Sequence, residues 1–140
     1  MASIAKDIRI DAPPPEVVWD ARRGFGALRI RLVPGFVIDS ELRVDVRVIT
    51  FFNGSVAHEQ LVGSDDDTRR LGYTVVEGPL GATHHNASAQ VITEPDGRSR
   101  FVWITDVLPD ELGVPTGQLM DRDLGVIKAR LKAEAGRLVR

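Results

Sequence analysis

The chain opens with a strand-like alternation of apolar and polar residues. Ile4, Ile8 and Ile10 fall on one face and charged residues on the other, which is typical of a half-buried strand over residues 4–11. Further apolar runs, most of them separated by turn residues, predict six more strands: 36–41, 44–51, 55–64, 69–77, 83–93 and 100–108. Short turns between consecutive strands indicate an antiparallel meander.

The hydrophobic period changes near the end of the chain. Apolar residues recur there every three or four positions, and they are Met120, Leu124, Ile127, Leu131, Ala135 and Leu138. This spacing predicts a long amphipathic helix over 116–139, with Thr116 as its N-cap. Two short helices are predicted at 16–22 and 25–32, because the prolines that end the first strand suit a helix start.

The order of these elements predicts an α+β fold in one domain, residues 1–140. A seven-stranded antiparallel sheet must twist and curl, and the long helix is the element that its concave face can hold. Aromatic residues make up only 6% of the chain, so one helix and few bulky side chains leave the concave side partly open. We therefore expect a ligand cavity between sheet and helix.

Composition narrows the function classes. The chain has 18 basic and 20 acidic residues and a formal net charge of -2, without the basic stripe of a nucleic-acid-binding face. It has no cysteine, which excludes disulfides and thiolate chemistry and fits a reducing compartment. We find no apolar run that suits a signal peptide or a membrane span and expect a cytoplasmic protein.

The turn at Asn53-Gly54 leaves two strand registers open. A two-residue turn would place Glu59 opposite Val48, whereas a three-residue loop would place it opposite Arg47. Both turn types accept glycine at the last position, so the turn alone does not decide between them. A three-residue loop at 65–67 would further place Glu59 opposite Tyr73.

Arg47, Glu59 and Tyr73 would then form a polar row on the concave face. A buried carboxylate must be paired or protonated, and the arginine and the tyrosine hydroxyl supply partners. The same residues could contact a ligand, hold the fold together, or lie on the solvated sheet face.

The second polar cluster lies in the strand at 83–93. Strand alternation puts His84, Asn86 and Ser88 on one side and His85 on the other, with His85 expected to face solvent. Because adjacent histidines point to opposite sides, the sequence predicts no metal site. It contains no phosphate-binding loop or nucleophile elbow, and we expect no cofactor.

Several motifs recur in the order and spacing of one known superfamily. They are Ile10-Asp11-Ala12-Pro13, Val17-Val18-Trp19, Phe25-Gly26-Ala27-Leu28, Pro34-Gly35, Val46-Arg47, Asn53-Gly54, Glu59-x-Leu61, Asp65-Asp66, Tyr73 and Val102-Trp103. The chain resembles the START/Bet v 1-like (SRPBCC) superfamily, in particular its polyketide cyclase/dehydrase branch. Leu32-Val33 and Asp45 depart from the usual pattern, so the substrate of the family is not transferred.

The resemblance implies a helix-grip fold, favours the register that pairs Arg47 with Glu59, and puts Asn86 and Ser88 in the pocket. The leading hypothesis is a module that binds an apolar or aromatic small molecule, such as a lipid or polyketide. Its expected polar contacts are Arg47, Glu59, Tyr73, His84, Asn86 and Ser88, and its expected walls are Ile38, Val75, Trp103, Leu124 and Ile127.

Two other functions stay open from the sequence. One is a cyclase, aromatase or dehydratase in which His84 or Glu59 acts as base. The other is a homodimeric interaction domain without ligand, because Val46, Val48 and Val56 point outward in the favoured register. The expected partner is thus a small molecule, with the protein a monomer or a homodimer.

Overall fold

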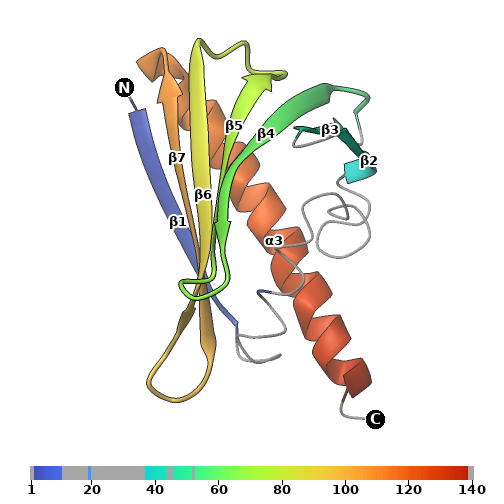
Figure 1. The fold of residues 1–140 in the computed structure, drawn as a ribbon, viewed down its shortest axis with the longest axis vertical. Coiled ribbons are helices and arrows are strands. Elements are labelled where there is room, and N and C mark those ends of the chain that lie inside the picture. The colour runs from blue at the N-terminus through green and yellow to red at the C-terminus, as the bar shows by residue number, and fades with distance from the viewer. Residues whose placement is uncertain (1, 11–18, 20–36, 44–45, 52, 139–140) are drawn as a thin grey trace.

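The computed structural model describes residues 2–10, 19, 37–43, 46–51 and 53–138, with side chains for 2–9, 19, 46–51 and 53–131. An antiparallel sheet bends around one long helix (Figure 1). The strands are β1 (Ala2–Ile10), β2 (Val37–Arg43), β3 (Val46–Phe51), β4 (Val56–Asp65), β5 (Arg70–Glu77), β6 (His84–Thr93) and β7 (Ser99–Leu108).

The strand order across the sheet is β1-β7-β6-β5-β4-β3-β2. Strands β2 to β7 follow one another as the predicted meander. Strand β1 lies at the edge of the sheet beside β7, with Ile4 opposite Thr105. Along β1 the exposure alternates residue by residue, as expected for a strand with one covered face. The two edges of the sheet are therefore β1 and β2.

The long helix α3 (Gly113–Leu138) follows a short 3-10 turn, η2 (Asp110–Leu112). Its predicted apolar stripe is confirmed over the part with described side chains, since Met120, Leu124, Ile127 and Leu131 are each at most 3% exposed. Burying one such side chain stabilises a fold by about 1.5–3 kcal/mol. Thr116 is not the N-cap that we expected, because the helix already begins at Gly113.

The core between helix and sheet joins α3 to strands β3, β5, β6 and β7. Its buried members are Trp19, Ile49, Leu71, Tyr73, Ala87, Ala89, Val91, Phe101, Leu124, Ile127 and Leu131. The structure thus confirms an α+β fold in which an antiparallel sheet curves around a C-terminal helix. The two predicted short helices lie outside the described residues, apart from Trp19, whose Nε1 donates to Asp66 Oδ1 at 2.8 Å.

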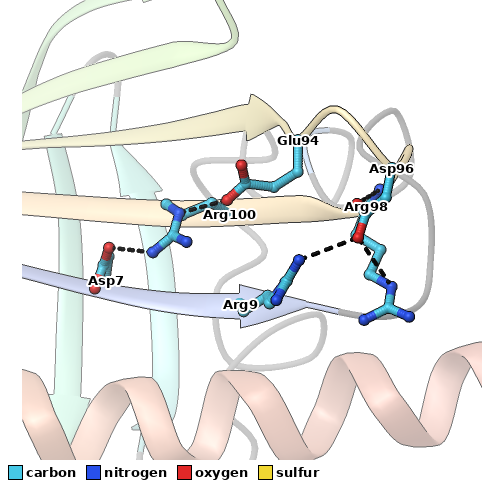
Figure 2. A network of polar contacts seen from close by, with 6 residues as sticks. All are labelled: Asp7, Arg9, Glu94, Asp96, Arg98 and Arg100. Atoms are coloured by element: carbon cyan, nitrogen blue, oxygen red, sulfur yellow. Dashed lines mark hydrogen bonds and ion pairs between the residues drawn. The ribbon is translucent and has the colours of Figure 1, made fainter.

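A network of ion pairs joins β1 to the β6–β7 hairpin (Figure 2). Arg100 Nη1 donates to Asp7 Oδ2 at 2.6 Å, and its Nε donates to Glu94 Oε1 at 2.5 Å. Arg9 Nη2 donates to Asp96 Oδ2 at 3.0 Å. Such exposed pairs contribute little stability individually, but they fix the hairpin against the neighbouring edge strand.

The β3–β4 turn decides the register that the sequence left open. Phe51 N donates to Ser55 O and Gly54 N donates to Phe51 O, both at 2.9 Å. Gly54 has a φ of 85°, a conformation that glycine adopts at little cost. The loop therefore has three residues, and Arg47 lies opposite Glu59, as the resemblance favoured.

We expect Gly54→Ala to lower the free energy of unfolding by about 1–2 kcal/mol, because a Cβ is disfavoured at positive φ. An added Cβ would meet no atom within 4 Å there, so the loss would come from the backbone alone. Urea denaturation measures it. Gly63→Ala is the matched control, since it also meets nothing within 4 Å and has no positive φ. Equal stability of the two variants would contradict this loop conformation.

Candidate functional site

A buried ion pair lies on the concave face of the sheet. Arg47 is 1% exposed and Glu59 is 8% exposed. Arg47 Nε donates to Glu59 Oε1 at 2.6 Å, and Arg47 Nη2 lies 2.5 Å from the same oxygen. Because removing either charge from water is costly, each group depends on its partner. The opposite positions in β3 and β4 supply that pairing.

Tyr73 packs against this pair from β5. The Cζ atom of Arg47 lies 5.2 Å from the centre of the tyrosine ring, within range of a cation–π interaction. Our prediction that Tyr73 lies opposite Glu59 is wrong: Tyr73 pairs with Leu61, and Glu59 pairs with Val75.

The longer β4–β5 turn explains this error. Asp65 pairs with Arg70, so the turn spans four residues instead of three, and the pairing shifts again between Leu61 and Gly63. Tyr73 is nevertheless 3% exposed and contacts Arg47, so the three polar side chains still form one cluster.

A cavity of about 80 Å³ lies beside this cluster, between the sheet and α3. A buried water needs about 10–15 Å³ of such space, so the cavity is larger than a packing defect. Its walls are Arg47, Ile49, Phe51, Glu59, Tyr73, Leu80, His85, Trp103, Thr105, Thr116, Leu119, Met120 and Asp123.

Two further hollows adjoin the cavity and share Phe51, Leu80 and Leu119 with it. One has a volume of about 70 Å³ and the other about 310 Å³. The larger one is also lined by residues of the β3–β4 turn and the first turns of α3, among them Ser55 and Pro115. The hollows therefore extend the cavity toward this end of the sheet, away from the β6–β7 hairpin.

The histidine in the cavity is His85. On β6 the buried side chains are Ala87, Ala89 and Val91, and His85 shares their face by strand alternation. Our expectations that His84 contacts the pocket and that His85 faces solvent are wrong, because this small-residue face, and not the opposite one, is turned toward α3.

Asn86 and Ser88 lie on the outer face of the sheet together with His84. Asn86 and Ser88 line a more open hollow of about 330 Å³ on that face, and the Thr74 hydroxyl donates to Asn86 Oδ1 at 2.6 Å. The expected pocket positions of Asn86 and Ser88 are thus wrong for the same reason as that of His84.

Burial lowers the pKa of His85 below its usual 6.5. The negative charge of Glu59 opposes this shift, and the neighbouring His84 adds slightly to it. Desolvation is the largest cause, since it disfavours the charged imidazolium. His85 is therefore a neutral imidazole at pH 7, able to donate one hydrogen bond and to accept another.

We expect stability to fall on acidification through about pH 6.5, where the unfolded chain binds a proton that folded His85 rejects. The free energy of unfolding should rise with pH from the folded pKa up to this value, by at most about 1.4 kcal/mol per pH unit. Urea denaturation between about pH 5 and 8 measures the slope. His85→Gln should flatten it, whereas His84→Gln on the outer face should leave it; an equal effect of both variants would contradict this assignment.

The other predicted wall residues divide into three groups. Trp103 lines the cavity and Val75 lines the adjoining hollow. Leu124 and Ile127 pack in the core and do not line the cavity, because the helix turns nearer its N-terminus lie there instead. Ile38 lies in β2, and its side chain is outside the described residues.

Besides His85, eight cavity residues are absent from the site that the sequence predicts: Ile49, Phe51, Leu80, Thr105, Thr116, Leu119, Met120 and Asp123. Thr105 extends the inward face of β7 beyond Trp103, while Thr116, Leu119 and Asp123 come from the first turns of α3. Within the part of the chain that the structure describes, no three His, Cys, Asp or Glu side chains are placed to hold a metal ion. Among the described helices, none is long and apolar enough to cross a membrane.

Residues 1–140 match the family described as polyketide cyclase / dehydrase and lipid transport. The solved structure of XoxI from Bacillus cereus is similar with a TM-score of 0.83 and 22% identity, over 100% of this chain and 99% of that one. The structure of a START superfamily protein from Mycobacterium smegmatis is similar with a TM-score of 0.77 and 10% identity, over 94% of this chain and 97% of that one. The structure of Zhui aromatase/cyclase from Streptomyces sp. R1128 has a TM-score of 0.73 and 16% identity, over 99% of this chain and 96% of that one.

The comparison with curated proteins gives no match. At these identities the solved structures establish the fold and leave the activity open, whereas the family match extends over the whole sequence. The observed fold, with a C-terminal helix held in a curved antiparallel sheet, agrees with both findings. The chain therefore belongs to the family described as polyketide cyclase / dehydrase and lipid transport.

Proposed function

We propose that this chain binds an apolar or aromatic small molecule, such as a lipid or polyketide, in the cavity between the sheet and α3. The observation that supports this proposal is a cavity whose walls include the apolar side chains of Ile49, Leu119 and Met120 and also the Arg47–Glu59 pair. Ligand sites combine mostly apolar walls with a few placed polar groups. The proposal takes residues 1–140 as one domain with seven strands and two short helices, acting without a cofactor.

The polar cluster of Arg47, Glu59 and Tyr73 is a preorganised part of the cavity wall. Arg47, Glu59 and Tyr73 hold one another in place, so their orientation exists before any ligand arrives. A preorganised site loses less entropy on binding than a mobile one. These three residues, together with His85, are the proposed orienting contacts, and Trp103 and Val75 are proposed walls.

Native mass spectrometry of the purified protein, compared with its denatured mass, tests this proposal. We expect extra mass that leaves on denaturation, or stoichiometric uptake of the neutral fluorescent probe N-phenyl-1-naphthylamine by the empty protein. A protein that carries no extra mass and also excludes the probe would overturn the binding function.

An enzyme of the cyclase or dehydratase type is the second candidate, and the observation that favours it is His85. A neutral imidazole inside a cavity is a competent general base, and Arg47 or Tyr73 could stabilise an enolate oxygen. Of the two bases expected from the sequence, His84 lies on the outer face of β6, whereas Glu59 lines the cavity. Turnover that disappears in His85→Gln while binding persists would establish the enzyme.

The outer sheet face preserves the homodimer hypothesis. Val56, Val62, Val76, Ile92 and Ile104 are 39–71% exposed, and exposed apolar patches often mark protein contacts. Static light scattering separates the cases, since the monomer mass is 15.4 kDa. A dimer that dissociates in Val62→Asp would assign this face to self-association.

A further inference from the structure

Three polar atoms in the cavity wall have no hydrogen-bond partner within the part of the chain that the structure describes. They are Nε1 of Trp103, Oγ1 of Thr105 and Oγ1 of Thr116, and all three are fully buried. Thr105 is 1% exposed and Thr116 is 2% exposed. In native proteins the large majority of buried polar groups are paired, so three such atoms around one space indicate a missing partner.

The three residues come from two elements, β7 and α3, that border the same cavity. Trp103 and Thr105 lie two residues apart on the inward face of β7, about 6–7 Å along the strand. Thr116 lies in the first turn of α3 and lines the same space. Together they form a polar patch, Trp103–Thr105–Thr116, in a cavity whose other polar cluster is Arg47–Glu59–Tyr73.

The hydrogen-bonding groups of the patch favour a ligand that places an oxygen atom beside them. An indole N–H only donates a hydrogen bond, whereas a hydroxyl both donates and accepts. A carbonyl oxygen, with two lone pairs, can accept from the indole N–H and from one of the two hydroxyls. A ligand hydroxyl can in addition donate to one of the threonines. A purely apolar ligand would leave all three groups unpaired, which is costly in a buried site.

The charges around the cavity disfavour an anionic ligand. The guanidinium of Arg47 is bound to Glu59 at 2.5 and 2.6 Å, so its charge is already compensated. His85 is neutral, and the carboxyl group of Asp123 lines the same space. A carboxylate taken into this cavity would lose its hydration without gaining an uncompensated cation.

We infer that the Trp103–Thr105–Thr116 patch is an oxygen-recognising subsite, and that the ligand is a neutral apolar molecule bearing a carbonyl or hydroxyl group. This inference rests on the proposed binding function and narrows its ligand class. It distinguishes ketones, phenols and alcohols from free fatty acids and from plain hydrocarbons. Hydrogen bonds at a desolvated patch give such discrimination, because the wrong ligand leaves the groups of the site unpaired.

Calorimetric titration of the protein into naphthalene, 2-naphthol and 2-naphthoate near pH 7 tests the subsite. The three probes share one ring system and differ in having no oxygen, a neutral hydroxyl and a carboxylate. We expect 2-naphthol to bind about tenfold or more tightly than either of the other two. Tighter binding of 2-naphthoate would overturn the preference for neutral ligands.

Substitutions in the patch test whether it causes the preference for 2-naphthol. Thr105→Val and Thr116→Val conserve side-chain shape and remove one unpaired hydroxyl each, and Trp103→Phe removes the indole donor. Each should lower the preference for 2-naphthol over naphthalene by about fivefold or more while retaining naphthalene affinity. Thr74→Val, whose hydroxyl bonds to Asn86 on the outer face, is the matched control and should change neither affinity.

The outcomes separate the subsite from the binding function. Equal binding of all three probes, unchanged in both threonine variants, would remove the subsite and leave the cavity as a general apolar site. Failure of all three probes and of N-phenyl-1-naphthylamine would remove the binding function itself. Circular dichroism checks that each variant folds, and the two threonine variants test the patch independently from different elements.

Discussion

Arg47→Met should lower the free energy of unfolding by about 3–5 kcal/mol, the cost of leaving one partner of a buried ion pair without the other. The side chain of Arg47 is 2% exposed and that of Glu59 is 10% exposed, so the remaining charge would stay largely removed from bulk solvent. The variant also loses the contact of the guanidinium with the Tyr73 ring. Urea denaturation near pH 7 measures the loss.

The double variant Arg47→Met/Glu59→Leu separates pairing from burial. Because it leaves no isolated charge, we expect it to recover most of the stability lost in the single variant, and replacement of a buried pair by apolar groups is often neutral or better. Arg9→Met, which breaks an exposed ion pair with Asp96, is the control and should have a far smaller effect. A double variant as unstable as Arg47→Met would contradict a pair that acts as one unit.

Stability and function need not follow each other at this pair. If the double variant folds but no longer binds a small molecule, the charged pair is retained for the ligand, because the apolar version satisfies the fold equally well. If it folds and binds as before, the pair is structural and recognition lies with the Trp103–Thr105–Thr116 patch. The same protein thus answers two questions when both quantities are measured.

The Asn53-Gly54 turn left two registers open in the sequence, and the resemblance favoured the one that pairs Arg47 with Glu59, which the structure has. The positive φ at Gly54 sets the loop length, and loop length sets the register of the two strands. The position of Tyr73 escaped prediction because it depends on the next turn, where four residues and a shift near Gly63 replace the expected three-residue loop. The run of aspartates at 65–67 does not reveal the length of the turn, because Asp65 still belongs to β4 and only Asp66 and Asp67 lie in the turn.

The face of β6 was assigned wrongly although the sequence held a signal for it. Ala87, Ala89 and Val91 alternate with polar residues, and this small apolar face is the one that packs toward the helix. The polar residues of the opposite face suggested a pocket lining, and the resemblance reinforced that reading. Apolar alternation would have placed His85 inside from the sequence alone.

The helix residues of the cavity could not be predicted from periodicity. Periodicity identified the stripe that includes Leu124 and Ile127 correctly, but a stripe does not tell which of its turns packs in the core and which borders a cavity. That division depends on where α3 lies along the sheet. The sequence predicts Thr116 as an N-cap because threonine is common at that position, whereas the helix begins three residues earlier and Thr116 lines the cavity.

Leu119→Trp should lower the affinity for N-phenyl-1-naphthylamine by about tenfold or more. Leu119 borders the cavity and both adjoining hollows, so a larger side chain at this position occupies the space that a ligand would use. Fluorescence titration of the probe measures the change. Lys128→Trp, at an exposed position of the same helix, introduces the same side chain away from the cavity and should leave the affinity unchanged.

The stability of Leu119→Trp then tells whether the space is present without a ligand. Inserting extra atoms into a well-packed core costs about 1–3 kcal/mol, whereas a ring that enters an existing cavity gains contacts and buries apolar surface. We therefore expect the free energy of unfolding to stay level or to rise. A loss of stability together with unchanged probe binding would mean that the probe binds elsewhere and that the space beside Leu119 is filled in the folded protein. Lost probe binding with retained stability would identify the cavity beside Leu119 as the binding site.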